Sequence, residues 1–206
     1  MYTRIKICGI TNLEDARAAA DLGTDALGFI FVPNTPRYIE PEVAKRIIRN
    51  LPPFVISVGV FADALPEVIL QTVRTCGLNA VQLHGSETPE YCSEINGPKL
   101  IKAFRIKDRS SLSSIPDYEV SAYLLDTYIK GKKGGTGETF NWNLAREAKK
   151  YGRIIVAGGL TPENVAQAIL HVRPYAVDVG SGVESSPGKK DHSKIKAFVE
   201  NVKALC

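Results

Sequence analysis

The stretch Ala176-Val177-Asp178-Val179, followed directly by Gly180-Ser181-Gly182-Val183-Glu184, is the most informative one in this chain of 206 residues. An apolar strand that ends in small residues exposes backbone N–H groups, because few Cβ atoms cover them. A helical turn after such a strand aims its positive end at the same place. A phosphate would fit there, although glycine-rich loops are also common as simple turns. The rest of the chain favours the phosphate, because this loop closes a series of β/α units.

Short β-rich runs alternate with helical patterns from one end of the chain to the other, which is typical of βα units around a parallel sheet. Strands are expected at 4–8, 26–31, 55–61, 80–83, 100–104, 122–126, 154–157 and 176–179. Helices are expected at 12–22 after Thr11, at 41–50 and 66–76 from a first-turn proline, at 161–170, and near 111–115. Eight units predict a single-domain (β/α)8 TIM barrel over residues 1–206 rather than an open doubly wound sheet.

Composition limits the partners. The chain is 44% hydrophobic and 23% charged, and its net charge of +4 comes from Lys and Arg scattered among acids, so no nucleic-acid stripe stands out. No apolar run is long enough to span a membrane. Cys8, Cys76, Cys92 and Cys206 lack metal-ligand spacing and indicate reduced thiols in a cytoplasm. We therefore expect a small anionic ligand, no metal, and a monomer or a homodimer.

Chemistry in a barrel lies where strands end, because the βα loops converge over one mouth. Three strand ends carry proton-transfer groups: Cys8, His84 and Asp126. Lys6 projects to the same face as Cys8 and is expected to lower the thiol pKa, which would make Cys8 a base or a nucleophile. Asp126 follows an apolar run and is suited to donate a proton. The alternatives are a core cysteine, a structural histidine and a solvated or helix-capping aspartate.

Three glycine-rich segments follow the sixth, seventh and eighth expected strands. They are Gly134-Gly135-Thr136-Gly137, Gly158-Gly159 and Gly180-Ser181-Gly182. Loops after the last strands of a barrel frequently bind phosphate. None of the segments fits a nucleotide-binding motif, so a phosphorylated small molecule is the simpler ligand and no cofactor is expected. Arg37, in the loop after the second strand, has a planar fork that suits a carboxylate, unless it is merely solvated.

Motifs from nearly every βα unit, in this order and spacing, resemble phosphoribosylanthranilate isomerase of tryptophan biosynthesis. They are Lys6-Ile7-Cys8-Gly9-Ile10-Thr11, Gly28-Phe29-Ile30-Phe31, Pro36-Arg37-Tyr38-Ile39, Val81-Gln82-Leu83-His84-Gly85, Leu124-Leu125-Asp126, Gly135-Thr136-Gly137, Ala157-Gly158-Gly159-Leu160 and Asp178-Val179-Gly180-Ser181-Gly182-Val183-Glu184. The resemblance departs at Gly180, where the family usually has a serine.

The resemblance implies an Amadori rearrangement without a cofactor, in which Asp126 protonates the furanose ring oxygen and the Cys8 thiolate removes the C2 proton. It also implies that Arg37 faces the anthranilate carboxylate. The remaining substrate-binding residues it implies, mostly phosphate ligands, are His84, Gly135, Gly137, Gly158, Gly159, Ser181 and Gly182. The alternatives are another phosphosugar barrel enzyme, of the epimerase or indole-glycerol-phosphate synthase type, and a non-catalytic ligand-binding barrel.

Overall fold

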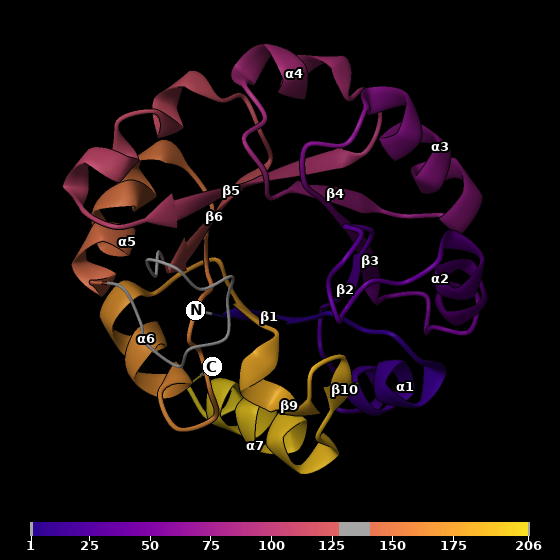
Figure 1. Cartoon of the computed structure of the whole chain (residues 1–206). Coiled ribbons are helices and arrows are strands. Elements are labelled where there is room, and N and C mark those ends of the chain that lie inside the picture. Colours follow the sequence, from indigo (N-terminus) through magenta and orange to yellow (C-terminus); the bar gives the residue numbers. More distant parts are fainter. Residues whose placement is uncertain (1, 128–140, 206) are drawn as a thin grey trace.

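A computed structural model describes residues 2–127 and 141–205. Eight strands form a closed barrel in chain order, and each described pair of neighbours is parallel (Figure 1). The strands are β1 (Arg4–Cys8), β2 (Ala26–Ile30), β3 (Ile56–Phe61), β4 (Ala80–Leu83), β5 (Lys99–Ile106), β6 (Ala122–Thr127), β7 (Ile154–Val156) and β8 (Ala176–Val179). The predicted (β/α)8 barrel is therefore confirmed, and its strands lie within a few residues of the expected ranges.

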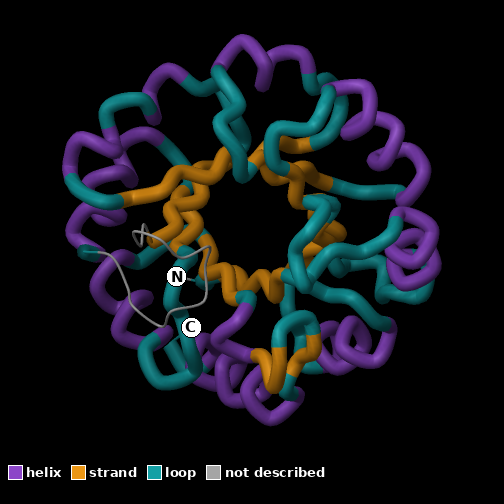
Figure 2. Tube along the Cα trace, in the orientation of Figure 1, coloured by secondary structure: helices purple, strands orange, loops and turns teal. Residues whose placement is uncertain are grey.

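Helices surround the barrel on the outside (Figure 2). They are α1 (Leu13–Asp21), α2 (Pro41–Ile48), α3 (Pro66–Cys76), α4 (Pro89–Glu94), α5 (Trp142–Ala148), α6 (Val165–Val172) and α7 (His192–Lys203). No helix within the described part of the chain is long and apolar enough to cross a membrane.

Three of the expected helices differ from the structure. The N-cap of α1 is Asn12, whose side chain accepts from Asp15 N at 2.8 Å, whereas Thr11 donates its hydroxyl to Gly188 O. The helix expected from 161 begins only at Val165. Between β5 and β6 there are two 3-10 helices, Arg109–Leu112 and Ile115–Asp117, in place of an α-helix near 111–115. Pro116 explains the last difference, because it lacks an N–H and disfavours helical backbone at the preceding residue.

The two faces of the strands pack against different surroundings. On β1, Ile5 and Ile7 are buried in the large apolar core between strands and helices, together with residues such as Phe198 of α7. Lys6 and Cys8 alternate with them and face the barrel interior. A second, smaller apolar cluster belongs to that interior. It consists of Ala103, Ala122, Leu124, Ile155, Ala157 and Ala176.

A hairpin follows β8 and turns back toward β1. The 3-10 turn Ser181–Val183 leads into β9 (Glu184–Ser186), which pairs antiparallel with β10 (Lys189–Lys190). Lys190 is buried, and its ammonium donates to Cys8 O at 2.6 Å and to Gly180 O at 3.0 Å. This hairpin therefore ties together the ends of the first and last strands at the mouth of the barrel.

Candidate active site

A cavity of about 160 Å³ lies at the carboxyl ends of the strands. Every described residue that the sequence proposed for the site lines it. They are Cys8, Arg37, His84, Asp126, Gly158, Gly159, Ser181 and Gly182. Gly135 and Gly137, the two other proposed residues, lie outside the described residues. The structure therefore brings together an acid, a thiol, an imidazole, a guanidinium and two glycine-rich loops, each from a different part of the chain.

The thiol of Cys8 has a different proton affinity from the one expected. Burial raises the pKa of Cys8 above its ordinary value, and it outweighs the ammonium groups of Lys6 and Lys190, which act to lower it, while the carboxylate of Asp178 raises it further. Lys6 acts to lower the pKa of Cys8, as expected, but burial has the larger effect, so the net pKa of the thiol is raised. A thiolate formed here is a stronger base than an ordinary one, but it is less abundant at neutral pH.

His84 and Asp126 form a pair at the mouth of the barrel. Their closest atoms, His84 Nε2 and Asp126 Oδ2, lie 3.2 Å apart, and each side chain is 24% exposed. The loop after His84 is held by a buried ion pair in which Lys102 donates to Glu87 at 2.9 Å and to Gly85 O at 2.9 Å. The backbone that carries His84 is therefore held by β4 before it and by this buried ion pair after it.

Lys6, Gln82 and Asp178 form a hydrogen-bonded network inside the barrel, and Gln82 and Asp178 also line the cavity. The Lys6 ammonium donates to Gln82 Oε1 at 2.9 Å and to Asp178 Oδ1 at 3.0 Å, and all three residues are buried. The register of the sheet explains the contact, because Lys6 and Asp178 are paired residues of β1 and β8. Burial acts to lower the pKa of Lys6, but the Asp178 carboxylate, together with Cys8 when it is ionised, outweighs burial and raises that pKa, which keeps the ammonium charged.

Arg37 does not project alone into the cavity. Its Nε and one terminal nitrogen donate to the two oxygens of Glu184 at 2.8 and 2.6 Å, and Lys190 donates to Glu184 Oε1 at 3.1 Å. The hydrogen bond from Arg37 and the nearby Lys190 charge hold the pKa of Glu184 below its ordinary value, against the effect of burial. Such a bidentate pair fixes the plane of the guanidinium before any ligand binds.

The two described glycine-rich loops approach each other closely. A Cβ atom on Gly182 would lie 1.9 Å from Leu160 O, so only glycine fits there. Gly158 and Gly159 have φ angles of +76° and +66°, which glycine adopts without strain. Asn164 fixes their loop, because it accepts from Thr161 N and donates to Gly159 O, each at 2.8 Å. These loops are therefore preformed.

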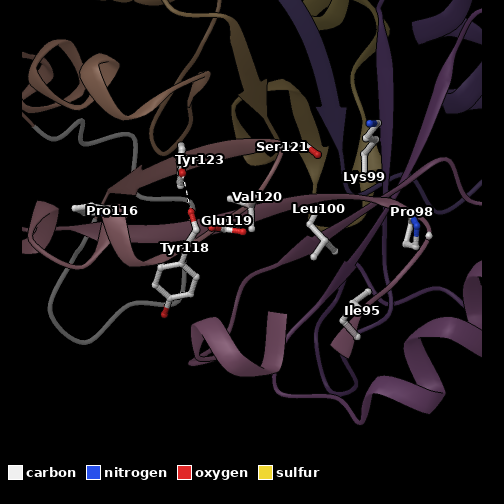
Figure 3. A pocket seen from close by; sticks show the side chains of 11 residues that line it. Ile95, Pro98, Lys99, Leu100, Pro116, Tyr118, Glu119, Val120, Ser121 and Tyr123 are labelled. Carbon is white, nitrogen blue, oxygen red and sulfur yellow. Dashed lines mark hydrogen bonds between the residues drawn. The ribbon is translucent and has the colours of Figure 1, made fainter. Parts of the chain in front are cut away.

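Two larger cavities lie elsewhere. One, of about 550 Å³, lies beside β5 and the segment that leads into β6, where Tyr123 donates its hydroxyl to Tyr118 O (Figure 3). The other, of about 710 Å³, lies at the amino ends of the strands and is lined by Arg4, Phe54 and Tyr175, among others. Neither has a cysteine or a histidine in its described lining. Size therefore does not identify the site, whereas the convergence of acid, thiol and imidazole does.

Sequence reasoning assigned no role to Gln82, Asp178, Glu184 or Lys190. A signal was available for two of them, because Gln82 and Asp178 are polar residues inside short apolar strands, where a polar side chain needs a partner. Glu184 and Lys190 gave no comparable signal, because only the hairpin after β8 brings them beside Arg37 and Cys8.

Comparisons with known proteins agree with this geometry. A model of the family described as N-(5′-phosphoribosyl)anthranilate (PRA) isomerase matches residues 5–201. The chain is 57% identical over 203 residues to the N-(5′-phosphoribosyl)anthranilate isomerase of Geobacter sp. (strain M21), covering 98% of this chain and 99% of that one.

Two solved structures are similar over nearly the whole chain. One is a phosphoribosyl anthranilate isomerase in complex with reduced 1-(o-carboxyphenylamino)-1-deoxyribulose 5-phosphate, with a TM-score of 0.89, 46% identity, and coverage of 98% of this chain and 100% of that one. The other shows monomers of the dimeric phosphoribosylanthranilate isomerase from Thermotoga maritima, with a TM-score of 0.88, 45% identity and the same coverage.

Proposed function

The chain belongs to the N-(5′-phosphoribosyl)anthranilate isomerase family, and on this premise we propose which of its residues carry the reaction. The enzyme converts N-(5′-phosphoribosyl)anthranilate to 1-(2-carboxyphenylamino)-1-deoxyribulose 5-phosphate, an Amadori rearrangement of tryptophan biosynthesis. This rearrangement moves oxidation within one molecule, so one acid and one base suffice. The observation that carries our assignment is that Cys8 and Asp126, 118 positions apart in the chain, line one small cavity.

Asp126 is the acid. It gives its proton to the furanose ring oxygen while the bond from that oxygen to C1 breaks and the substrate nitrogen forms a double bond to C1. Cys8, as thiolate, then removes the proton from C2, and the electron pair of that C–H bond forms the C1–C2 double bond of an enolamine. In the same step the electron pair of the C1–N double bond returns to nitrogen. Proton transfer to C1, with loss of the proton from the C2 hydroxyl group, then yields the ketone. Because the pKa of Cys8 is raised, turnover depends on a scarce but strong base.

The two ends of the substrate are held on opposite sides of the reacting carbons. We assign the phosphate to the loops of Gly158, Gly159, Ser181 and Gly182, whose lack of bulky side chains allows close approach to backbone N–H groups. Gly135 and Gly137 belong to the same proposal. Arg37 takes the anthranilate carboxylate through the terminal nitrogen that does not contact Glu184.

Alkylation of Cys8 tests these assignments. Iodoacetamide should label Cys8 and inactivate the enzyme, assayed by the fluorescence decrease of freshly generated N-(5′-phosphoribosyl)anthranilate. The reduced product analogue should protect Cys8 from the reagent, because the analogue binds in the cavity that Cys8 lines. Cys76 and Cys92 are buried and serve as internal controls in a mass-spectrometric digest. Inactivation without labelling of Cys8, or labelling that the analogue does not slow, contradicts the assignment.

We further propose a cytoplasmic homodimer. A reducing compartment keeps the Cys8 thiol available as a base. A dimeric relative and an apolar surface support the second copy, since the Phe54 side chain is 92% exposed beside the cavity at the amino ends of the strands. Light scattering of the wild type and of Phe54→Ser tests this: a wild-type monomer, or an unchanged dimer in the variant, contradicts it.

A further inference from the structure

We propose that Gln82 is a positioning residue for the acid: it fixes His84 as the neutral imidazole that carries its proton on Nε2, and so leaves Asp126 able to hold the proton it donates. This inference rests on the proposed role of Asp126. It concerns a residue of β4 that is 1% exposed and contacts His84, the partner of the acid.

Lys6 sets the orientation of the Gln82 amide. An ammonium only donates hydrogen bonds, and Lys6 Nζ lies 2.9 Å from one end of that amide. This end must therefore be the oxygen, Oε1, because the opposite orientation would place an NH₂ group against the ammonium. Asp178, which accepts from the same ammonium at 3.0 Å, keeps Lys6 in place.

The oriented amide then decides the tautomer of His84. Its NH₂ group, Gln82 Nε2, lies 2.9 Å from His84 Nδ1 and can only donate hydrogen bonds. His84 Nδ1 must accept, so it carries no proton. An imidazolium has a proton on both nitrogens and would lose this contact, and the neutral ring with its proton on Nδ1 would lose it as well. The remaining form carries its proton on Nε2, which lies 3.2 Å from Asp126 Oδ2 and donates to it.

The neutral form matters because of its effect on Asp126. A cation beside a carboxylate favours the ionised form, which cannot donate a proton. A neutral N–H donor orients the carboxyl group without adding a full charge. The charged and titratable groups that line the cavity around His84 are Asp126 from β6, Cys8 from β1, Asp178 from β8 and Arg37 from the loop after β2, with Lys6 of β1 behind Gln82. The backbone next to His84, at Gly85 and Ser86, is held by Lys102 of β5, by Glu87 and by Asp63. The carboxylates favour an imidazolium and the cations disfavour it, whereas the Gln82 donor acts directly on Nδ1, the nitrogen that an imidazolium would have to protonate.

The test combines two substitutions with a readout of the tautomer. Gln82→Glu keeps the acceptor for Lys6 but presents an oxygen to Nδ1, so His84 should become an imidazolium. Gln82→Met keeps the volume and removes the donor, so both neutral tautomers should be populated. Long-range ¹⁵N–¹H spectra of the histidine rings report these states directly. In the wild type, the neutral ring of His84 should carry its proton on Nε2.

Kinetics provide the second readout. Gln82→Glu should lower kcat at least about tenfold, change KM less, and shift the acid limb of the pH profile of kcat. The kcat of Gln82→Met should lie between that of Gln82→Glu and that of the wild type. The control is Ile155→Val, a substitution of a buried residue in the same barrel interior, which should keep both the tautomer and the pH profile.

The proposal is overturned by a wild-type His84 that is protonated on Nδ1 at neutral pH, or by a folded Gln82→Glu variant with an unchanged spectrum and pH profile. If Gln82→Glu does not fold, the histidine spectra of the wild type and of Gln82→Met still test the proposal. The tautomer of His84 is measured without turnover. An active Asp126→Asn variant would therefore refute the role of Asp126 as the acid, whereas the tautomer spectra would still test the role of Gln82.

Discussion

The two sides of the barrel interior differ sharply in chemistry. The side formed mainly by β5, β6 and β7 is apolar, with Leu124 and Ile155 among its largest residues. The polar side, as we call it, consists of the buried residues Lys6 on β1, Asp178 on the neighbouring β8, and Gln82 on β4, which the Lys6 side chain reaches across the interior. Burying charged groups costs free energy that their mutual contacts only partly return, and apolar side chains of similar volume fill such spaces as well or better.

This difference leads us to propose that the apolar side contributes only packing, whereas the polar side is kept for the reaction. Its charges are paired and its amide is hydrogen-bonded at both ends, so the network is stable as a unit and costly to break in part. It connects the surroundings of the proposed base, Cys8, to those of the proposed acid, Asp126. Substitutions on the polar side should therefore change turnover, whereas conservative substitutions on the apolar side should not.

The largest effect is expected from Asp126→Asn, which should lower kcat at least about 1,000-fold, because an amide has no acidic proton to give to the ring oxygen. Calorimetry with the reduced product analogue should show binding close to that of the wild type. Wild-type turnover in a variant that binds the analogue normally would refute the acid assignment.

Lys6→Met tests whether the polar side is stable only as a unit. We expect it to destabilise the protein by about 3–5 kcal/mol, because it leaves the Asp178 carboxylate buried without its ion-pair partner. Urea denaturation measures this. The double variant Lys6→Met/Asp178→Leu should recover most of that stability while remaining impaired in turnover. If the single and double variants are equally stable, the two residues are not a unit.

Cys8→Ser should lower kcat at least about 100-fold with the fold intact, because a serine hydroxyl is a far weaker base. In the wild type, kcat/KM should rise with pH through the range where thiols normally ionise and beyond it, because the pKa of Cys8 is raised. An alkaline rise that survives unchanged in the serine variant would belong to another group.

The same raised pKa predicts how stability depends on pH. The folded protein holds the thiol proton more tightly than the unfolded chain, so this contribution is fully present below the unfolded pKa of the thiol and is lost as pH rises through the folded one. The free energy of unfolding of the wild type, measured by denaturation, should therefore decrease at alkaline pH, and it should decrease less in Cys8→Ser. Equal slopes for both proteins would contradict this.

Arg37→Ala should raise KM about tenfold and change kcat less, because the carboxylate it binds is remote from the reacting carbons. Arg37→Lys is the matched variant, since it keeps the charge but loses the planar fork that Glu184 orients. Steady-state kinetics of both variants measure this, and a pure kcat defect would exclude the role in binding.

The smallest effect is expected on the apolar side. Ile155→Val should cost about 1 kcal/mol of unfolding free energy, the usual result of removing one buried methylene group, and should leave kcat within error. Urea denaturation and the fluorescence assay measure the two. A clear fall in kcat in the folded variant would show that both sides of the interior take part in the reaction.

The sequence was sufficient where the signal was local. Alternation of short strands and helical runs predicted the eight strands, and the strand-end rule selected Cys8, His84 and Asp126, which the structure places around one cavity. It was insufficient where two local effects compete. For α1, Thr11 and Asn12 are both good capping residues, and only the contact of Thr11 with Gly188 leaves the cap to Asn12.

By itself, the sequence determined the barrel and the positions of its chemical groups, because periodicity and strand ends depend on residues that are neighbours in the chain. Only the tertiary structure decided the state of those groups. The proton affinity of Cys8 follows from how deeply it is buried and from Lys190, 182 positions away, and the orientation of Arg37 follows from Glu184, 147 positions away. Desolvation and charge pairing depend on distances between residues far apart in the chain, and these distances are set only when the barrel closes.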